Sequence, residues 1–581
     1  MLKKILAALV ICAWTLATLS SAMPNALRAQ TPLTTLVPPT PFQTSIPPTP
    51  IKPLEQSGLA RITADKAKPR LTIGIPYNAE PFASLNENGE VIGFEADIGR
   101  AIAEDWGIPV GGGNPPIFRQ VTRQDGVDLL QRGEIDLLMG QVIHTRAMEK
   151  TLDFSEPYFV NTQVALTLGS NSAQALSSLG GQTVGVVIGS SSQQAVEEWA
   201  KTSGASVTIK KLLMFDDGIR ALVAGEIAAL AGDRWDLDAR VAGNGLSGLK
   251  LLDGVFRDEP YSVAMRANDW ALRMLVNRTL QKLASDGRLD SINEQWFRKS
   301  LLPAERRVKP TVWSDLAKDK RSIYDFNVNI TAPAQPTLGL LAQSKMLRVA
   351  GLGQPDATGK LGVLDSLGQA LVNELARRWG VGVQFVTGSP EDLLASGGAD
   401  LALGIEPHWG NSDIPDRVDF TSIYATHGNR LLVATARNIS GFADLLFGNG
   451  KNLGIFANDE ASFTAAENIG KTAGVVGLRK ILIRSDEDIQ QYVSDGTMSA
   501  VFGDSLRLVP LAAKYSSFMK LLDKEYTSES IAFAVPRGDS EFREMVEQTM
   551  QDMAKDGTYE RIWKEQFNIG TPVSFIAWPE S

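Results

Sequence analysis

Short apolar runs and amphipathic segments alternate along this chain. Residues 70–75 and 182–188 are apolar runs of strand length, whereas 95–106 and 270–284 repeat their apolar residues at helical spacing. Strands that alternate with helices in this way predict a mostly parallel sheet with crossover helices. The pattern therefore indicates an α/β protein.

The same pattern is written twice. The segment 286–297, DGRLDSINEQWF, is similar to 556–567, DGTYERIWKEQF, and 225–233, GEIAALAGD, is similar to 496–504, GTMSAVFGD. Two matches in the same order, far apart, are hard to obtain by chance. A chain of 581 residues is also too long for one core, so we expect two tandem units, each with its own cores.

The N-terminus has the pattern of an export signal. Lys3 and Lys4 precede an apolar run, 5–19, and small residues at 20–22 offer a cleavage site. This run is short for a membrane-spanning helix, which needs about 20 residues, so a cleaved signal is favoured over an uncleaved anchor. The Pro/Thr-rich stretch that follows predicts a spacer. An extracytoplasmic protein, periplasmic or at the cell surface, is expected.

Composition narrows the function classes. The net charge of −9, from 57 basic and 66 acidic residues, argues against nucleic acid as a partner. Three histidines argue against a histidine-rich metal site, and the one cysteine, Cys12, lies inside the apolar N-terminal run. We expect no metal and no cofactor.

Several motifs in the first unit carry a family resemblance, and they are Pro81-Phe82, 93–97 (GFEAD), 133–136 (GEID), 153–158 (DFSEPY), 184–191 (VGVVIGSS) and 225–233. Together these motifs resemble the bacterial extracellular solute-binding proteins of the amino-acid type, which serve ABC importers and have the type II periplasmic-binding-protein fold. The resemblance spans residues 70–300 and returns more weakly over 346–570. It implies two lobes per unit, joined by two crossover strands and closing on a ligand.

The expected organisation follows from this resemblance. It comprises a signal peptide or anchor (1–22), a linker (23–65), solute-binding unit 1 (66–302), a connector (303–345), a degenerate unit 2 (346–570) and a tail (571–581). Within unit 1, lobe 1A would hold 66–160 and 261–302, and lobe 1B would hold 161–260.

The resemblance also suggests ligand-binding residues. Asp233 occupies the position of the aspartate that takes a ligand ammonium group, Ser190 and Ser191 fit a cradle for a carboxylate, and Phe82 sits where an aromatic ring lines the cleft. Solvated surface residues and a serine-rich turn are the alternative interpretation. In unit 2, Asp504 keeps the acidic position and is a possible second site. A degenerate or structural unit 2 is favoured over one that binds a different, perhaps cationic, solute.

The sequence departs from the family at the arginine that clamps a carboxylate, because Met148 stands there. Thr145 and Arg146 are candidate ligand-binding residues, with Arg146 as the candidate replacement for the clamp; a solvated loop charge is the alternative for Arg146. Unit 2 departs further, since Asp459 and Glu460 stand where an anion would dock. These departures leave a small polar, amino-acid-like solute as the expected ligand of unit 1.

The favoured function is therefore a non-enzymatic receptor that delivers a small polar solute to an ABC permease. An enzyme on the same fold, similar to cyclohexadienyl dehydratases, would need a general acid or base, with Glu80 and Glu95 as the nearest candidates. The Gly503-Asp504-Ser505-Leu506 motif of GDSL esterases lacks the other blocks of that family. A third possibility is an extracellular sensor or scaffold.

Overall fold

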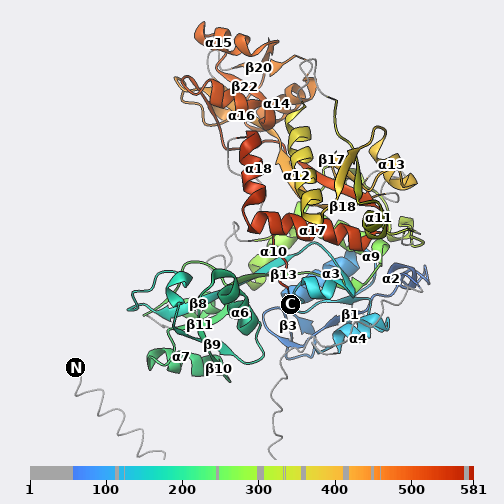
Figure 1. Ribbon diagram of the computed structural model, residues 1–581, viewed down its shortest axis with the longest axis vertical. Coiled ribbons are helices and arrows are strands. Elements are labelled where there is room, and N and C mark those ends of the chain that lie inside the picture. The colour runs from blue at the N-terminus through green and yellow to red at the C-terminus, as the bar shows by residue number, and fades with distance from the viewer. Residues whose placement is uncertain are drawn as a thin grey trace, which may run out of the picture. The chain divides into compact units, whose positions relative to one another are not determined.

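Each repeat contains two lobes, and each lobe is built on one mixed β-sheet (Figure 1). The computed structural model describes residues 56–110, 117–122, 125–243, 248–297, 307–330, 333, 335–354, 361–409, 418–446, 451–457, 459–567 and 575–580. The predicted export signal and most of the predicted linker lie outside these residues. Residues 45–581 form one compact body.

Lobe 1A has a five-stranded sheet of order β5-β1-β6-β14-β7, in which β1 pairs in parallel with β5 and β6. The strands are β1 (Ile73–Ile75), β5 (Phe118–Gln120), β6 (Leu137–Leu138), β7 (Leu152–Phe154) and β14 (Ala264–Arg266), with a small sheet of β2 (Asn78–Ala79), β3 (Ala83–Leu85) and β4 (Val91–Ile92). The helices are α3 (Phe94–Asp105), α4 (Gly126–Gln131), α5 (Arg146–Glu149), α9 (Trp270–Ser285) and α10 (Arg288–Trp296).

Lobe 1B has a sheet of order β10-β9-β11-β8-β12, with β13 also paired to β8. Its strands are β8 (Phe159–Leu168), β9 (Thr183–Val187), β10 (Thr208–Leu212), β11 (Ala229–Asp233), β12 (Leu249–Leu251) and β13 (Arg257–Tyr261). Helix α6 (Ser192–Ser203) packs its apolar residues into one cluster, and α7 (Phe215–Val223) and α8 (Arg234–Gly243) pack theirs into another. Helices therefore cover both faces of the sheet, as parallel strands require.

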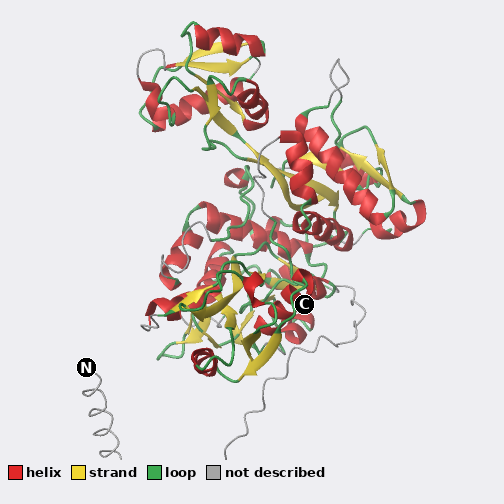
Figure 2. Ribbon diagram, turned by 60° about the vertical axis from the view of Figure 1, so that its left-hand side comes forward, coloured by secondary structure: helices red, strands yellow, loops and turns green. Residues whose placement is uncertain are grey.

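Unit 2 repeats this plan in lobes 2A and 2B (Figure 2). Lobe 2A contains β15 (Met346–Ala350), β16 (Gly382–Phe385), β17 (Leu401–Ile405), β18 (Val418–His427), β24 (Glu529–Pro536), α12 (Val363–Trp379), α13 (Pro390–Ser396), α17 (Ser540–Lys555) and α18 (Thr558–Phe567). Lobe 2B contains β19 (Asn429–Ala434), β20 (Asn452–Phe456), β21 (Arg479–Ile483), β22 (Ala500–Asp504), β23 (Met519–Leu521), α14 (Glu460–Thr472), α15 (Asp486–Ser494) and α16 (Ser505–Lys514).

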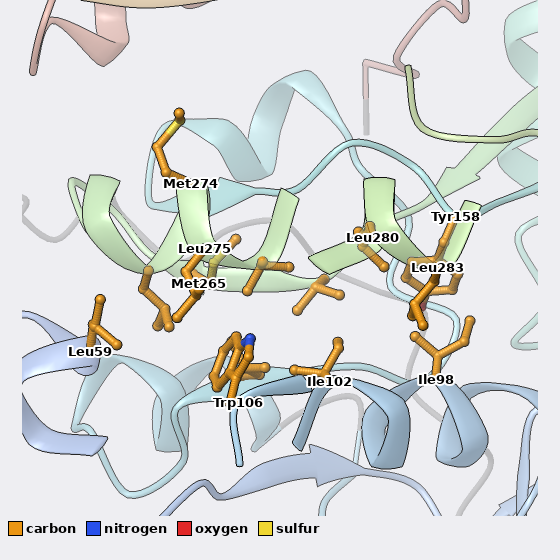
Figure 3. Packing of buried hydrophobic residues seen from close by; sticks show 14 of the residues in the cluster. Leu59, Ile98, Ile102, Trp106, Tyr158, Met265, Met274, Leu275, Leu280 and Leu283 are labelled. Atoms are coloured by element: carbon orange, nitrogen blue, oxygen red, sulfur yellow. The ribbon is translucent and has the colours of Figure 1, made fainter. Parts of the chain in front are cut away.

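The core of lobe 1A shows why the helical spacing of 270–284 matters. Leu275, Leu280 and Leu283 of α9 point toward Ile98 and Ile102 of α3, and all five are fully buried (Figure 3). Burial of each such side chain contributes roughly 1.5–3 kcal/mol. The stripe of apolar residues thus fixes α9 on α3 and holds the sheet of lobe 1A in place.

Two long antiparallel strands connect the lobes of unit 1. β8 starts directly after Tyr158, and β13 pairs with it so that Glu259 lies opposite Asn161. In unit 2, β18 and β24 pair in the same way, with Glu529 opposite His427. These strands are the crossovers that the family resemblance implies, and their polar residues return below.

Each repeat begins with a helix that lies inside the predicted linker or connector. Asp269 accepts a hydrogen bond from Ser57 Oγ (2.6 Å) at the start of α2 (Gly58–Ile62). Its counterpart Asp539 accepts one from the backbone N–H of Thr337 (2.7 Å) at the start of α11 (Thr337–Ser344). The linker and connector predictions are therefore wrong for these residues, because a tertiary carboxylate caps helices too short to show a clear period.

Equivalent residues of the two repeats meet each other. Trp270 and Ser540, which follow Asp269 and Asp539, share a hydrogen bond (Nε1–Oγ, 2.7 Å). Arg273 of unit 1 forms a buried ion pair with Asp419 of unit 2. Contact between the same surface of two partners is the property of a twofold interface, so lobes 1A and 2A pair as a fused pseudo-dimer.

Candidate functional site

Asp233 lies at the end of β11, where β11 pairs antiparallel with β8, and faces Gln163 across the ladder. Asn161 Nδ2 donates hydrogen bonds to Asp233 Oδ1 (2.7 Å) and to Glu259 Oε2 (2.8 Å). Gln163 Nε2 also donates to the Asp233 carboxylate, and it lies 3.0 Å from Glu259 Oε2. We call these four residues the Asp233 network.

The serines after β9 join this network only in part. Ser191 Oγ lies 3.1 Å from Gln163 Nε2, and Ser192 Oγ donates to Gln163 Oε1 (2.8 Å). The Ser190 hydroxyl instead donates to the backbone carbonyl of Val187 (2.7 Å). The structure thus brings Ser191 next to Asp233 through Gln163 and leaves the Ser190 side chain bonded to its own loop.

The two carboxylates of the Asp233 network are balanced differently. Glu259 is fully buried and pairs with Arg257 (Nη2–Oε1, 2.8 Å), which also contacts Glu198 at 3.1 Å. In the described part of the chain, no lysine or arginine forms an ion pair with Asp233. Burial and then the nearby Glu259 charge raise the pKa of Asp233 to about 6, although the Asn161 and Gln163 hydrogen bonds oppose this shift. Asp233 is therefore an ionised carboxylate at neutral pH that has no ion-pair partner among the described residues.

Phe82 of lobe 1A belongs to a buried aromatic cluster that reaches Trp235 of lobe 1B, and its expected place at the cleft stays a prediction. Its side chain is 0% exposed, and its ring packs at 5.3–5.6 Å from Phe159, Tyr261 and Phe297. Trp235 of α8, two residues after Asp233, completes the cluster at 5.4 Å from Phe82. From the sequence alone, an aromatic residue beside a proline that lines a cleft cannot be told from one that fills a core. Phe82 therefore supports contact between lobes 1B and 1A through Trp235.

Thr145 and Arg146 also have other roles than expected. The Thr145 hydroxyl caps α5 by accepting from the Met148 N–H at 3.2 Å. Arg146 Nη2 pairs with Asp552 of α17 at 2.7 Å, and its Nη1 lies 3.4 Å from Glu580 in the tail. Arg146 is therefore not placed as the expected carboxylate clamp. Its guanidinium instead joins unit 1 to unit 2.

The tail reinforces that assignment. The backbone N–H of Arg146 donates to Pro579 O (2.9 Å), and Trp578 stacks on His144 with ring centroids 4.2 Å apart. Met148 packs with the apolar residues around Leu152. The loop that follows β6 is thus covered by residues from the far end of the chain, a contact that no local sequence pattern can reveal.

Sequence reasoning missed Asn161, Gln163 and Glu259. The signal was present in β8, FVNTQVALTL, where two amides sit two residues apart in an otherwise apolar strand. Residues two apart on a strand point to the same face. A buried polar pair on one face of a crossover strand therefore indicated a network near the hinge.

Unit 2 has a corresponding network with a different composition. Asp504 lies opposite Asn429 across β22 and β19, and His427 Nδ1 lies 2.5 Å from Asp504 Oδ2. His427 Nε2 is 3.7 Å from Glu529. Burial lowers the pKa of His427, but Asp504, Glu529 and Glu406 together outweigh it, so the pKa is raised. Asp504 thus has an internal basic partner, and the GDSL serine, Ser505, is buried with its Oγ accepting from Gly428 N–H.

A separate groove lies away from Asp233. This groove of about 480 Å³ runs between α9 and the connector, lined by Arg278, Lys282, Trp313 and Arg321 among others. Asp319 pairs with both arginines and Asp105 pairs with the lysine, so each of these cations already has an acidic partner. We assign the site by the chemistry around Asp233 and not by the size of this groove.

Metal clusters and membrane-spanning helices are both absent from the residues that the structure describes. No group of three or more histidine, cysteine, aspartate or glutamate side chains there is placed to hold a metal ion. No helix there is long and apolar enough to cross a membrane.

Comparisons with known proteins agree with the repeated fold. The family of bacterial extracellular solute-binding proteins, family 3, matches this chain over residues 71–299 and 367–569. The ABC transporter glutamine-binding protein GlnH of Bacillus subtilis (strain 168) is 31% identical over 246 residues, 42% of this chain and 86% of that protein. The L-cystine-binding protein TcyJ of Escherichia coli (strain K12) is 26% identical over 239 residues, 40% of this chain and 84% of that protein.

A solved structure of an ancestral arginine-binding protein bound to arginine is 33% identical to the aligned part of this chain. It covers 39% of this chain and 98% of that chain, with a TM-score of 0.32.

Proposed function

The chain belongs to the bacterial extracellular solute-binding proteins, family 3, and we propose that unit 1 captures a small polar solute between lobes 1A and 1B for an ABC permease. The observation that carries this proposal is Asp233, an ionised carboxylate at the hinge without a basic partner among the described residues. A partly buried charge favours a counter-charge, and a ligand ammonium group supplies one. Glutamine- and cystine-binding relatives support an amino-acid-like solute.

Unit 2 has a structural role in this proposal. His427 already balances Asp504, and α17 of unit 2 supplies the partner of Arg146. The contacts of Arg273 and Trp270 with unit 2 would keep lobe 1A in a fixed position while lobe 1B moves. Export through the N-terminal signal, with or without retention at the membrane, belongs to the same proposal.

No observation favours the enzyme alternative. Glu95 accepts two contacts from the backbone N–H of Gln141 (2.9 and 3.0 Å) and a hydrogen bond from the Tyr158 hydroxyl. A carboxylate held in this way positions a loop and a strand, and it is poorly placed to move protons to or from a substrate.

Thermal unfolding of the purified full-length protein tests the proposal. A panel of the twenty amino acids and common small amines should contain at least one compound that raises the melting temperature. At about 100-fold saturation the gain is roughly 2.7 kcal/mol. Asp233→Asn should abolish the shift, whereas Asp253→Asn, an exposed aspartate of the same lobe, should keep it. Retention of the full shift in Asp233→Asn would overturn the proposal.

A further inference from the structure

We propose that the solute of unit 1 is a compact organic cation without a carboxylate, an amine or a guanidinium compound. This inference rests on the proposed function of the Asp233 site and names its ligand class. It departs from the amino-acid ligands of the relatives, and three features of the site support it.

The first feature is the kind of hydrogen-bonding capacity left open at the site. The N–H donors of Asn161 and Gln163 are directed at the Asp233 and Glu259 carboxylates. Asn161 is 1% exposed, and its Oδ1 has no hydrogen-bond partner among the described residues. Buried polar atoms are nearly always satisfied, so this acceptor calls for a donor. The Asn161 Oδ1 acceptor and the Asp233 carboxylate therefore suit a ligand rich in N–H groups.

The second feature is the balance of charge. Arg257 serves Glu259 and Glu198, and this leaves Asp233 as the carboxylate without an ion-pair partner within the described chain. A monovalent cation would neutralise that one charge. A zwitterion would bring a second carboxylate next to Asp233 and Glu259, and like charges at such a site repel each other.

The third feature is the position of the basic residues that a ligand carboxylate would need. Arg146 is held by Asp552 and by the carbonyl of Gln548. The Ser190 hydroxyl donates to Val187 O, and Ser191 Oγ faces the Gln163 amide. A buried carboxylate without a cation is strongly disfavoured, so the pairing of Arg146 with Asp552 disfavours a ligand carboxylate.

Matched pairs of compounds that differ by one carboxylate test this inference directly. We would titrate full-length protein calorimetrically with agmatine and L-arginine, with cadaverine and L-lysine, and with putrescine and L-ornithine. In at least one pair, the amine should bind about tenfold or more tightly than its amino acid. The same amine should lose binding in Asp233→Asn and keep it in Asp253→Asn.

The outcomes separate this inference from the function on which it rests. Tighter binding of an amino acid than of its amine would overturn the cation proposal and leave the solute-binding function intact, provided that Asp233→Asn abolishes that binding. Absence of binding by all six compounds would also overturn the cation proposal. If the wider panel then gave no Asp233-dependent thermal shift, the proposed function would fall as well.

Discussion

The two units present the same hinge network with one decisive exchange. Asp233 and Asp504 occupy equivalent positions opposite β8 and β19, and Glu259 and Glu529 lie opposite Asn161 and His427. Unit 1 therefore has a neutral amide where unit 2 has a basic imidazole.

Because of this exchange, the same fold can either bind a cationic ligand at its acidic position or pair that position with its own basic side chain. Asn161 donates hydrogen bonds to Asp233 and leaves the negative charge unbalanced. His427 contacts Asp504 through a ring nitrogen and has a raised pKa, so it carries a positive charge in mildly acidic solution. Unit 2 has not simply lost its polar groups, because its acidic residue, Asp504, is retained and pairs with His427.

The largest expected effect is a loss of folding stability, and it tests whether lobes 1A and 2A are held together as one body. Arg273→Ala would leave Asp419 without its closest cation in a buried interface, where both side chains are 4% exposed. Breaking a buried ion pair by removing one partner costs about 3–5 kcal/mol. Urea unfolding would measure the loss. Arg288→Ala, which removes exposed ion pairs to Asp286 and Glu104, should cost less than about 1 kcal/mol.

An Arg273→Ala loss no larger than that of Arg288→Ala would contradict the pseudo-dimer. The acid response offers an independent check. Burial raises the pKa of Asp419, but Arg273, Arg537 and Arg543 outweigh it, so the pKa is lowered. The stability from Asp419 is then present above its unfolded pKa and is lost as the pH falls through the folded value.

The next effect concerns the protonation of Asp233. Its pKa of about 6 means that ligand affinity should hold near neutral pH and fall as Asp233 becomes protonated. Well below that pKa, the loss approaches about tenfold for each pH unit. Calorimetric titration of a cation between about pH 5 and pH 8 would measure it. Affinity that stays constant across this range would show that Asp233 does not hold the ligand.

An exchange of residues between the units should give a smaller and more specific effect. Asn161→His places the imidazole of unit 2 beside Asp233, where it would compete with a ligand cation. We expect about a tenfold loss of affinity near pH 6 and a smaller loss near pH 8, since the imidazole is then neutral. Thr162→His is the matched control, because Thr162 lies on the opposite face of β8 and pairs with Asp258 in an exposed position. Equal losses in both variants would remove the basis for the comparison.

The smallest effect belongs to unit 2 itself. A raised folded pKa means that His427 stabilises the fold below its unfolded pKa and that this contribution is lost as the pH rises through the folded value. Asp504→Asn removes the partner and should lower stability by about 1 kcal/mol near pH 5.5, with little change near pH 8. Urea midpoints at the two pH values would measure this, and a loss that grows with pH would contradict the assignment.

The fold class was predictable from the sequence, and the family match confirms it. Periodic apolar runs and the repeated 286–297 and 556–567 segments depend on local order, which a sequence displays directly. Asp233 was proposed because the family resemblance implies an acidic residue at the end of this strand, and its role as a ligand contact stays a prediction. Asn161 and Gln163 were missed because β8 was interpreted as a connection between lobes, without regard to which face its amides share.

Arg146 shows the limit of local reasoning. Its partners Asp552 and Glu580 lie some 400 residues away in sequence, and only the pairing of lobes 1A and 2A brings them close. The helices α2 and α11 were likewise hidden, because their caps, Asp269 and Asp539, are long-range partners. Whatever depends on contact between the repeats could not be inferred from either repeat alone.

Binding stoichiometry is the most direct measurement of the central claim, that Asp233 holds a ligand cation while Asp504 is already occupied. Calorimetry on the full-length protein near neutral pH should give one solute per chain for the wild type and for Asp504→Asn, and none for Asp233→Asn. Two solutes per chain, or one solute retained in Asp233→Asn, would contradict the account.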